Sequence, residues 1–206
     1  TSLHSAFARP ASRRRHLDQG NLLRSLTLVI NGVPGGINLG QGVCDLDTPS
    51  PLREGAIACI EGGDRQLYTP YAGLPDLREA IAAKLRRHNG LDYSAENVAV
   101  CTGSSGAFFA AGMTLIEPGD EVIVFEPFYS YHWTTIPLFG AVPIAVPLDR
   151  DTMAFDPGAL RKAITKRTRA VIPVHLFGLA ADLTGLRRAV GDLPILEDAA
   201  QSFLAR

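Results

Sequence analysis

A short glycine- and serine-rich segment, Gly103–Gly106, lies between the pattern of a buried strand and that of an apolar helix. The first turn of an α-helix has backbone N–H groups without intrahelical partners, and the helix dipole adds partial positive charge there. Together with the hydroxyls of Ser104 and Ser105, such a turn can bind a phosphate group. An ordinary strand-to-helix turn is the alternative, because the segment is neither a GxGxxG nor a P-loop motif.

Two more segments with chemical potential follow predicted strands. Residues 126–133, Glu-Pro-Phe-Tyr-Ser-Tyr-His-Trp, contain four aromatic side chains, which either stack on a planar ligand or pack in the core. Glu197 and Asp198 close the last predicted strand. Burying a carboxylate is costly unless it is paired with a donor or a cation, and a protonated ring nitrogen would be such a partner. A solvated acid or a helix N-cap is the alternative interpretation.

The elements that must position these segments alternate along the chain. The sequence predicts strands over 97–101, 121–125, 141–146, 170–175 and 194–198, and helices over 103–116, 156–165 and 182–190. This alternation predicts an α/β fold with a mostly parallel sheet, in which ligands bind at the carboxyl ends of the strands. All three candidate segments fall at such ends. Pro143 favours an edge position for its strand.

Upstream, the chain has a different character. Residues 31–75 are rich in glycine and proline and predict loops around one helix, at about 51–61. An amphipathic helix is predicted over 77–87, because apolar residues recur there at helical spacing.

Composition excludes several classes of function. The 206 residues carry 20 Lys plus Arg and 21 Asp plus Glu, so the charge gives no reason to expect a nucleic-acid or anionic-membrane partner. No apolar run approaches the roughly 18 residues that span a bilayer. Three cysteines (Cys44, Cys59, Cys101) fit neither a metal site nor a disulfide framework and are expected to be buried or half-buried reduced thiols. The five scattered histidines give no reason to expect a metal.

Seven blocks of the sequence follow one another along the chain: residues 37–42 (Ile-Asn-Leu-Gly-Gln-Gly), 68–73, 77–82, 102–107, 118–122, 126–129 and 168–172. Taken together, they resemble the class I/II aminotransferase pattern of the pyridoxal-phosphate enzymes in the aspartate aminotransferase superfamily, called fold type I. The resemblance implies an α/β large domain with a mostly parallel sheet and flanking helices, incomplete at the C-terminus.

The resemblance implies a role for each segment singled out above. Gly103, Ser104 and Ser105 would hold the phosphate of pyridoxal 5'-phosphate. Tyr129 would stack on the pyridine ring, and Asp198 would pair with the ring nitrogen. That pairing keeps the nitrogen protonated, so that the ring can accept electrons from the substrate.

Three further assignments come from the same resemblance. Tyr68 would reach across a homodimer interface to the partner's cofactor phosphate, and Gly40 would lie in the loop that approaches the substrate carboxylate. Residues 173–178 and 195–201 depart from the class I/II pattern and resemble the sugar aminotransferases of the same fold. By that likeness, Gln201 would contact the phenolic oxygen of the cofactor.

The resemblance also implies a Schiff-base lysine a few dozen residues after Asp198, and the sequence ends at Arg206. Lys84, Lys162 and Lys166 fall in exposed helical patterns, so no catalytic residue is assigned and this chain alone is expected to be inactive. We expect an N-terminal arm and first helix over 1–36, a partial cofactor-binding large domain over 37–206, and no small C-terminal domain.

Three functions remain open at this stage. The first is an aminotransferase that uses an amino acid and a keto acid or keto sugar. The second is a lyase, decarboxylase or racemase of the same fold. The third is a lysine-less pseudoenzyme or binding module. A cytoplasmic location is expected, with an organelle as the alternative because residues 1–16 are rich in Arg and Ser and contain no acid.

Overall fold

The computed structural model describes residues 22–40, 42, 44–63 and 67–205. The chain divides into two compact units. The first contains His88–Gly90 and the residues from Cys101 onward, and the second contains Leu23–Arg87 and Leu91–Val100. The arginine-rich segment 1–16 lies outside the described residues, and the boundary at residue 37 stays a prediction. In the described part of the chain, no helix is both long and apolar enough to cross a membrane.

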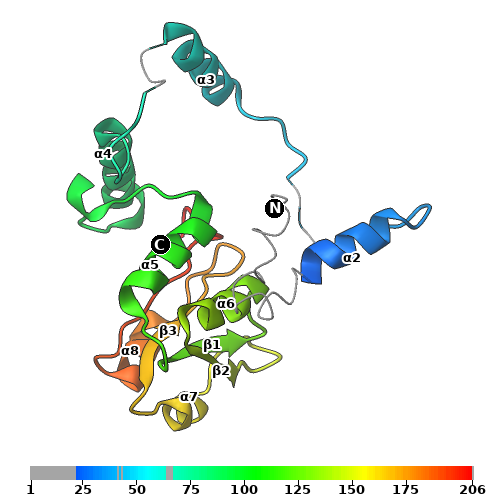
Figure 1. Cartoon of the computed structure of the whole chain (residues 1–206), viewed down its shortest axis with the longest axis vertical. Helices are drawn as coiled ribbons and strands as arrows, with labels where there is room; N and C mark the ends of the chain where they lie inside the picture. The colour runs from blue at the N-terminus through cyan, green and yellow to red at the C-terminus, as the bar shows by residue number, and fades with distance from the viewer. Residues whose placement is uncertain (1–21, 41, 43, 64–66, 206) are drawn as a thin grey trace, which may run out of the picture. The chain divides into compact units, whose positions relative to one another are not determined.

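The first unit is built on a parallel sheet (Figure 1). Its strands β1 (Glu121–Glu126), β2 (Val142–Pro147) and β3 (Thr168–Ile172) lie in the order β2-β1-β3, and Ile123 of β1 pairs with Ile144 and Val171. Residues 195–198 extend the sheet beyond β3 through parallel bridges from Val171 to Ile195 and from Val174 to Asp198. The predicted α/β class is confirmed, and β2 lies at an edge, as its proline indicated.

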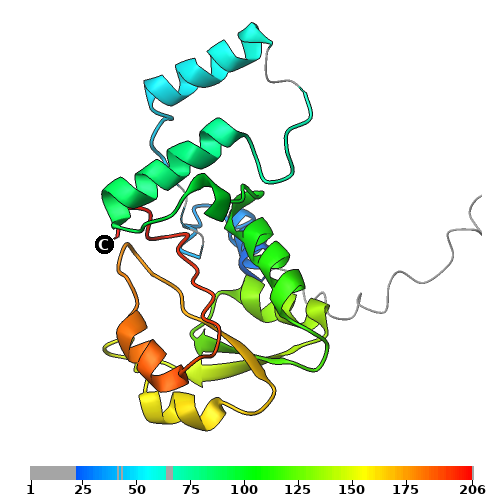
Figure 2. The ribbon, with the colours of Figure 1, turned by 90° about the vertical axis from the view of Figure 1, so that its left-hand side faces the viewer.

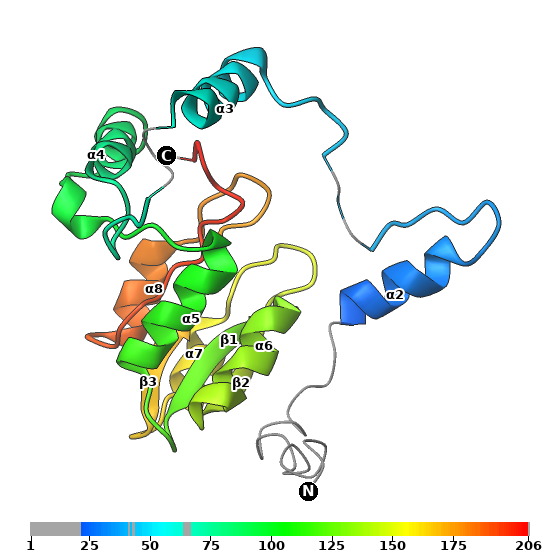
Figure 3. The ribbon, with the colours of Figure 1, turned by 45° about the horizontal axis from the view of Figure 1, so that its top comes forward.

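Helices cover both faces of this sheet (Figures 2 and 3). On one face lie α5 (Gly103–Leu115), α6 (Ser130–Thr135) and the 3-10 helix η4 (Ile136–Phe139), and on the other lie α7 (Pro157–Ala163) and α8 (Leu183–Val190). Because side chains alternate along a strand, Val122 and Val124 pack in the first layer and Ile123 packs in the second. The central strand is therefore buried on both sides, as expected for a parallel sheet.

The starts of α7 and α8 follow local sequence signals. Asp156 precedes Pro157, and its carboxylate accepts a hydrogen bond from the Gly158 N–H at 2.6 Å. Asp182 caps α8 in the same way, accepting from the Gly185 N–H at 2.8 Å. Both are N-cap acids, in which the carboxylate satisfies an N–H that has no helical partner, and both helices begin where the sequence predicted.

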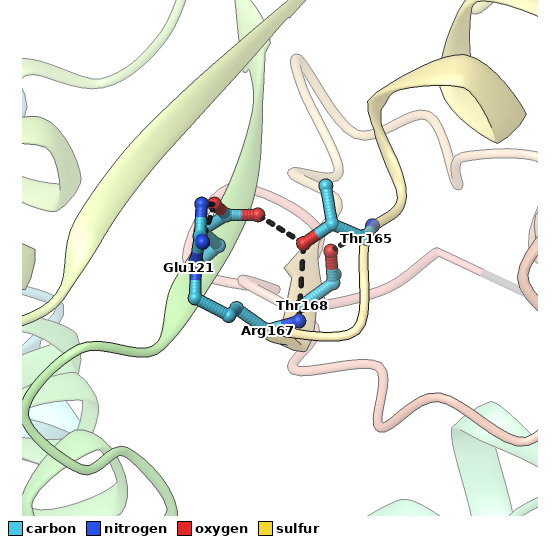
Figure 4. Close-up of polar contacts among 4 residues, drawn as sticks. All are labelled: Glu121, Thr165, Arg167 and Thr168. Carbon is cyan, nitrogen blue, oxygen red and sulfur yellow. Dashed lines mark hydrogen bonds and ion pairs between the residues drawn. The ribbon is translucent and has the colours of Figure 1, made fainter.

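A buried glutamate stabilises the end of the sheet at which strand β1 begins (Figure 4). Glu121, only 5% exposed, accepts hydrogen bonds from Thr165 Oγ1 at 2.5 Å and from Arg167 Nε at 2.9 Å, and it forms an ion pair with Arg167. The Thr165 backbone N–H donates to Thr168 Oγ1 at 2.8 Å. The bond from Thr165, then those from Arg167, hold the pKa of Glu121 below its ordinary value. The cluster ties the start of β1 to the connection between α7 and β3.

The second unit is helical. It contains α2 (Leu22–Asn31), α3 (Ser50–Gly62), α4 (Pro75–Lys84) and the 3-10 turn η3 (Ala95–Asn97), and a π-helical turn, η2 (Leu85–Asn89), continues α4. The helices predicted at 51–61 and 77–87 are confirmed. The strand predicted over 97–101 is wrong. The Arg78 side chain donates to the Val98 carbonyl and to the Ala95 carbonyl just before this segment, and the Val100 N–H donates to a loop carbonyl at Ala72.

The expectation of buried thiols is also wrong. Cys44, Cys59 and Cys101 are free and exposed. Cys59 belongs to α3, which has no buried residue within the described chain, and Cys101 lies just before the start of α5. The spacing of apolar residues predicts this helix, but it cannot show whether other elements pack against α3.

Candidate active site

A cavity of about 360 Å³ lies within the first unit, where residues 197–200 follow the last strand. This volume falls within the range of small-molecule sites, which begins at roughly 300 Å³. Its polar lining comes from Ser104, His132, Glu197 and Asp198, and the rest of its wall is made by Ala107, Phe108, Ala111, Ile172, Leu196, Ala199 and Ala200. The cavity therefore has an apolar wall and a few polar groups that come from separate elements.

The start of α5 forms one end of this cavity. Gly103 has a positive φ of 68°, a conformation that glycine adopts without strain, and it begins a helix of thirteen residues. Ser104, the next residue, lines the cavity. The Tyr131 hydroxyl donates to the Ser105 carbonyl at 3.3 Å and joins this first turn to α6. The turn thus presents a hydroxyl and the positive end of a helix dipole to a ligand.

Asp198 contributes a carboxylate to the cavity. Its Oδ2 lies 3.1 Å from Nε2 of His132, and its Oδ1 accepts the Ala200 N–H at 3.0 Å. The pKa of Asp198 is lowered, chiefly by the hydrogen bond from His132, against the opposing effect of burial. Asp198 therefore offers a carboxylate anion, held in one orientation, to whatever occupies the cavity.

His132 is the site residue that the sequence did not reveal. It lies in α6, is 3% exposed, and packs its ring 4.6 Å from that of Phe108. Tyr129, the N-cap of α6, meets the same imidazole edge-on at 5.4 Å and is 44% exposed. The sequence indicates an aromatic segment at 126–133, but no local signal connects the histidine within it to an aspartate far along the chain.

The structure brings Ser104 and Asp198 to one cavity, with Gly103 and Ser105 flanking Ser104 on α5. Gln201 is exposed and is not among the cavity-lining residues of the described chain. Its Oε1 accepts the Phe177 N–H at 3.2 Å.

Two predicted site residues belong to the second unit. Tyr68 is fully exposed there. The Gly40 N–H donates to Asn38 Oδ1 at 2.9 Å. Their proposed roles at a cofactor and a substrate stay predictions.

Lys162 and Lys166 lie away from the cavity. Lys162 is in α7 and Lys166 follows that helix, so both precede β3 and are exposed. Asp198, in contrast, pairs beyond the carboxyl end of β3, next to Val174. Lys84 ends α4 in the second unit. Among the lysines of the first unit, neither shares the end of the sheet that holds Asp198.

Comparisons with known proteins agree on one family. Residues 34–177 match the family described as "Aminotransferase class I and II". A probable N-succinyldiaminopimelate aminotransferase of Mycobacterium tuberculosis is 45% identical over 141 residues, which cover 67% of this chain and 35% of that protein. A probable aspartate/prephenate aminotransferase of Thermus aquaticus is 38% identical over 137 residues, which cover 66% of this chain and 36% of that protein.

Solved structures give the same answer. The N-succinyldiaminopimelate aminotransferase from Mycobacterium tuberculosis has a TM-score of 0.80 at 35% identity, covering 93% of this chain and 52% of that one. The aspartate aminotransferase from Thermus thermophilus with maleate has a TM-score of 0.82 at 27% identity, covering 94% and 58%.

The parallel sheet, its two helix layers and these structural neighbours define a fold type I pyridoxal-phosphate-dependent transferase. The sequence matches are more specific. The chain belongs to the class I and II aminotransferases, a family of pyridoxal-phosphate-dependent enzymes. It spans about a third of the length of the curated relatives that it matches.

Proposed function

We propose that this chain is the cofactor-binding part of an aminotransferase that moves an amino group between an amino acid and a keto acid or keto sugar. The observation that carries the proposal is Asp198, an oriented carboxylate that His132 holds in a cavity beside the start of α5. When bound, pyridoxal phosphate supplies a ring that accepts electrons from the substrate's α-carbon.

The residues of the cavity fit this cofactor in charge and in polarity. The first turn of α5 suits a phosphate dianion, and the carboxylate of Asp198 suits a protonated ring nitrogen. Phe108, Ile172 and Leu196 give the cavity an apolar wall for a planar ring. A ligand with an anionic end, a flat apolar body and a basic nitrogen matches all three features.

Each side chain then has a distinct task. Asp198 would hold a proton on the ring nitrogen, since the bond from His132 orients its carboxylate and lowers its pKa. Tyr129, which packs edge-on against His132, would stack on the ring. Gln201, whose Oε1 accepts the Phe177 N–H, would contact the phenolic oxygen through its amide nitrogen.

A fluorescence titration tests cofactor binding. The chain has one tryptophan, Trp133, which stacks on Phe128 at 4.5 Å in the same segment as His132. Its emission should be quenched by pyridoxal phosphate, and Asp198→Asn should weaken binding by about tenfold, because a charge-assisted contact is lost. Asp192→Asn, the same change at an exposed acid, is the control. Equal affinities for both variants and the wild type would remove the basis of the proposal.

The phosphate contact has a separate test. Pyridoxal, which has the ring and no phosphate, should bind more weakly than pyridoxal phosphate if the start of α5 holds the phosphate. Equal affinities for the two compounds would contradict the assignment of Gly103, Ser104 and Ser105.

The three lysines of the chain give a proposal about activity. Lys162 and Lys166 precede β3, away from Asp198, so we expect the 206-residue polypeptide alone to bind the cofactor without covalent attachment and not to turn over. Borohydride treatment followed by mass spectrometry should find no trapped cofactor. A trapped adduct, or a transamination rate from this polypeptide, would contradict this proposal.

Reaction type and assembly complete the proposal. An aminotransferase requires a keto acceptor, whereas a lyase or decarboxylase consumes the amino acid alone, so product analysis with and without the acceptor separates them. A lysine-less binding module would give no product with either. We also propose a homodimer, in which Tyr68 contacts the partner's cofactor phosphate and Gly40 approaches the substrate carboxylate. Sedimentation and a loss of cofactor affinity in Tyr68→Phe test the dimer and the tyrosine contact.

A further inference from the structure

His175 is a buried titratable residue to which the proposed function gives no task. The residue lies just beyond β3 and is 4% exposed. Nδ1 accepts the Ala181 N–H at 2.9 Å, and Nε2 lies 3.1 Å from Glu197 Oε2. A backbone N–H is always a donor, so Nδ1 carries no proton and the Nε2–H donates to Glu197. Both ring nitrogens are thus used, and the tautomer is fixed by the fold.

The same segment carries the backbone of Asp198. The His175 N–H donates to the Asp198 carbonyl at 2.9 Å, and the Asp198 N–H donates to the Pro173 carbonyl at 3.0 Å. Pro173 has no N–H, so the ladder between β3 and residues 194–198 lacks one bond immediately before Asp198. Residues 195–198 pair with β3 through the bridges Val171–Ile195 and Val174–Asp198, and the missing bond at Pro173 leaves the backbone just before Asp198 with one restraint fewer.

Two histidines provide that restraint from opposite sides. Glu197 and Asp198 are neighbours on an extended segment, so their side chains project to opposite faces. Asp198 bonds to His132 of α6, and Glu197 bonds to His175. A rotation of the backbone at residues 197–198 would have to break both contacts.

We propose that His175 is a positioning residue that acts through Glu197 to hold Asp198 in register with the cavity. The consequence for cofactor binding rests on the function proposed above. The geometric part, the restraint of Asp198 by the His175–Glu197 pair, stands on the described contacts alone.

Two substitutions of His175 distinguish the hydrogen bond at Nδ1 from the hydrogen bond at Nε2. His175→Asn keeps an acceptor near the Nδ1 position for the Ala181 N–H and is too short to reach Glu197. His175→Gln places an amide donor near the Nε2 position, so it can restore the bond to Glu197. If His175 acts through Glu197, the glutamine variant rescues and the asparagine variant does not. Glu197→Ala should behave like His175→Asn.

The first readout needs no cofactor. Amide hydrogen exchange measured by NMR should show the Asp198 N–H exchanging about tenfold faster in His175→Asn and Glu197→Ala than in the wild type or His175→Gln, with the amides of β1 unchanged. Unchanged protection of Asp198 in the asparagine variant would overturn the proposal. Equal loss in both histidine variants would do the same, because it would show a general packing defect.

The second readout reports the contact to the ring nitrogen. The preference for pyridoxal phosphate over its 1-deaza analogue, which lacks that nitrogen, should fall about tenfold in His175→Asn and be retained in His175→Gln. In an Asp198→Asn background His175→Asn should cause no further loss, because the two residues act on one contact. An independent further loss in that background would overturn the proposal.

The two readouts fail differently. A wild-type chain with no preference for the ring nitrogen would refute the proposed function, and the exchange of the Asp198 amide would still decide the role of His175. A wild-type preference that His175→Asn leaves intact would refute the role of His175 alone.

Discussion

Gly112, in the middle of α5, is a position where one added methyl group should collide with the core. A Cβ built there would lie 2.3 Å from Cε2 and 2.5 Å from Cζ of Phe139, whereas carbon atoms in contact sit about 3.5–4.0 Å apart. The Phe139 ring is 5% exposed and packs between Phe108 and Phe109, with centroids at 6.2 and 5.4 Å. It therefore has no solvent to move into.

The expected loss follows from two opposing effects. Overpacking of this kind costs about 1–3 kcal/mol, and alanine regains about 1 kcal/mol of helix propensity over glycine. Gly112→Ala should therefore lower the free energy of unfolding by up to about 2 kcal/mol. In a chain of this size that is a fall of up to roughly 8 °C in the melting temperature.

Gly106 of the same helix offers a matched control. A Cβ there would lie 3.4 Å from Thr102 Cβ, an ordinary contact, so Gly106→Ala keeps the propensity gain without the collision. Thermal unfolding followed by near-ultraviolet circular dichroism compares the two variants. If the melting temperature of Gly112→Ala is equal to or higher than that of Gly106→Ala, the packing of Phe139 against α5 is not as described.

Three further predictions concern charged and polar groups. Because folding lowers the pKa of Glu121, its ionised form stabilises the fold above the ordinary glutamate pKa, and this contribution is lost as the pH falls through the lowered value. Glu121→Gln should therefore be less stable than the wild type at neutral pH, with a gap that narrows in acid, and a pH-independent gap in urea unfolding would contradict this. Asp182→Ala removes the cap on the Gly185 N–H and should cost about 1 kcal/mol, measured by the same unfolding. His132→Phe keeps a ring against Phe108 and removes the bond to Asp198, so the pKa of Asp198 should rise in a carbon-13 NMR titration, and an unchanged pKa would contradict the pairing.

Local signals predicted a large part of the fold. The Gly-Ser turn at 103–106, the Asp156-Pro157 pair and Asp182 each start a helix where the sequence indicated. Such signals depend on hydrogen bonds between residues two or three positions apart, so they are visible in a single sequence. Asp198 could also be singled out, because a carboxylate closing a strand pattern faces the end of a parallel sheet where ligands bind.

Contacts between distant segments could not be predicted in the same way. The segment 97–101 has the composition of a strand, yet the Arg78 side chain takes up the carbonyls of Val98 and Ala95. His132 has no mark in the sequence that distinguishes it from a histidine packed in the core. Its role depends on Asp198, which is far away in the sequence and lies next to His132 only in the folded chain.

Helix α5 carries both reference points of the cavity. Ser104 in its first turn lines the cavity, and Phe108, one turn later, packs on the imidazole that bonds to Asp198. Four residues of α-helix span about 6 Å and stretch very little. The helix therefore fixes the separation between these two reference points. The cavity should favour a ligand whose anionic end and basic nitrogen are separated by a matching distance.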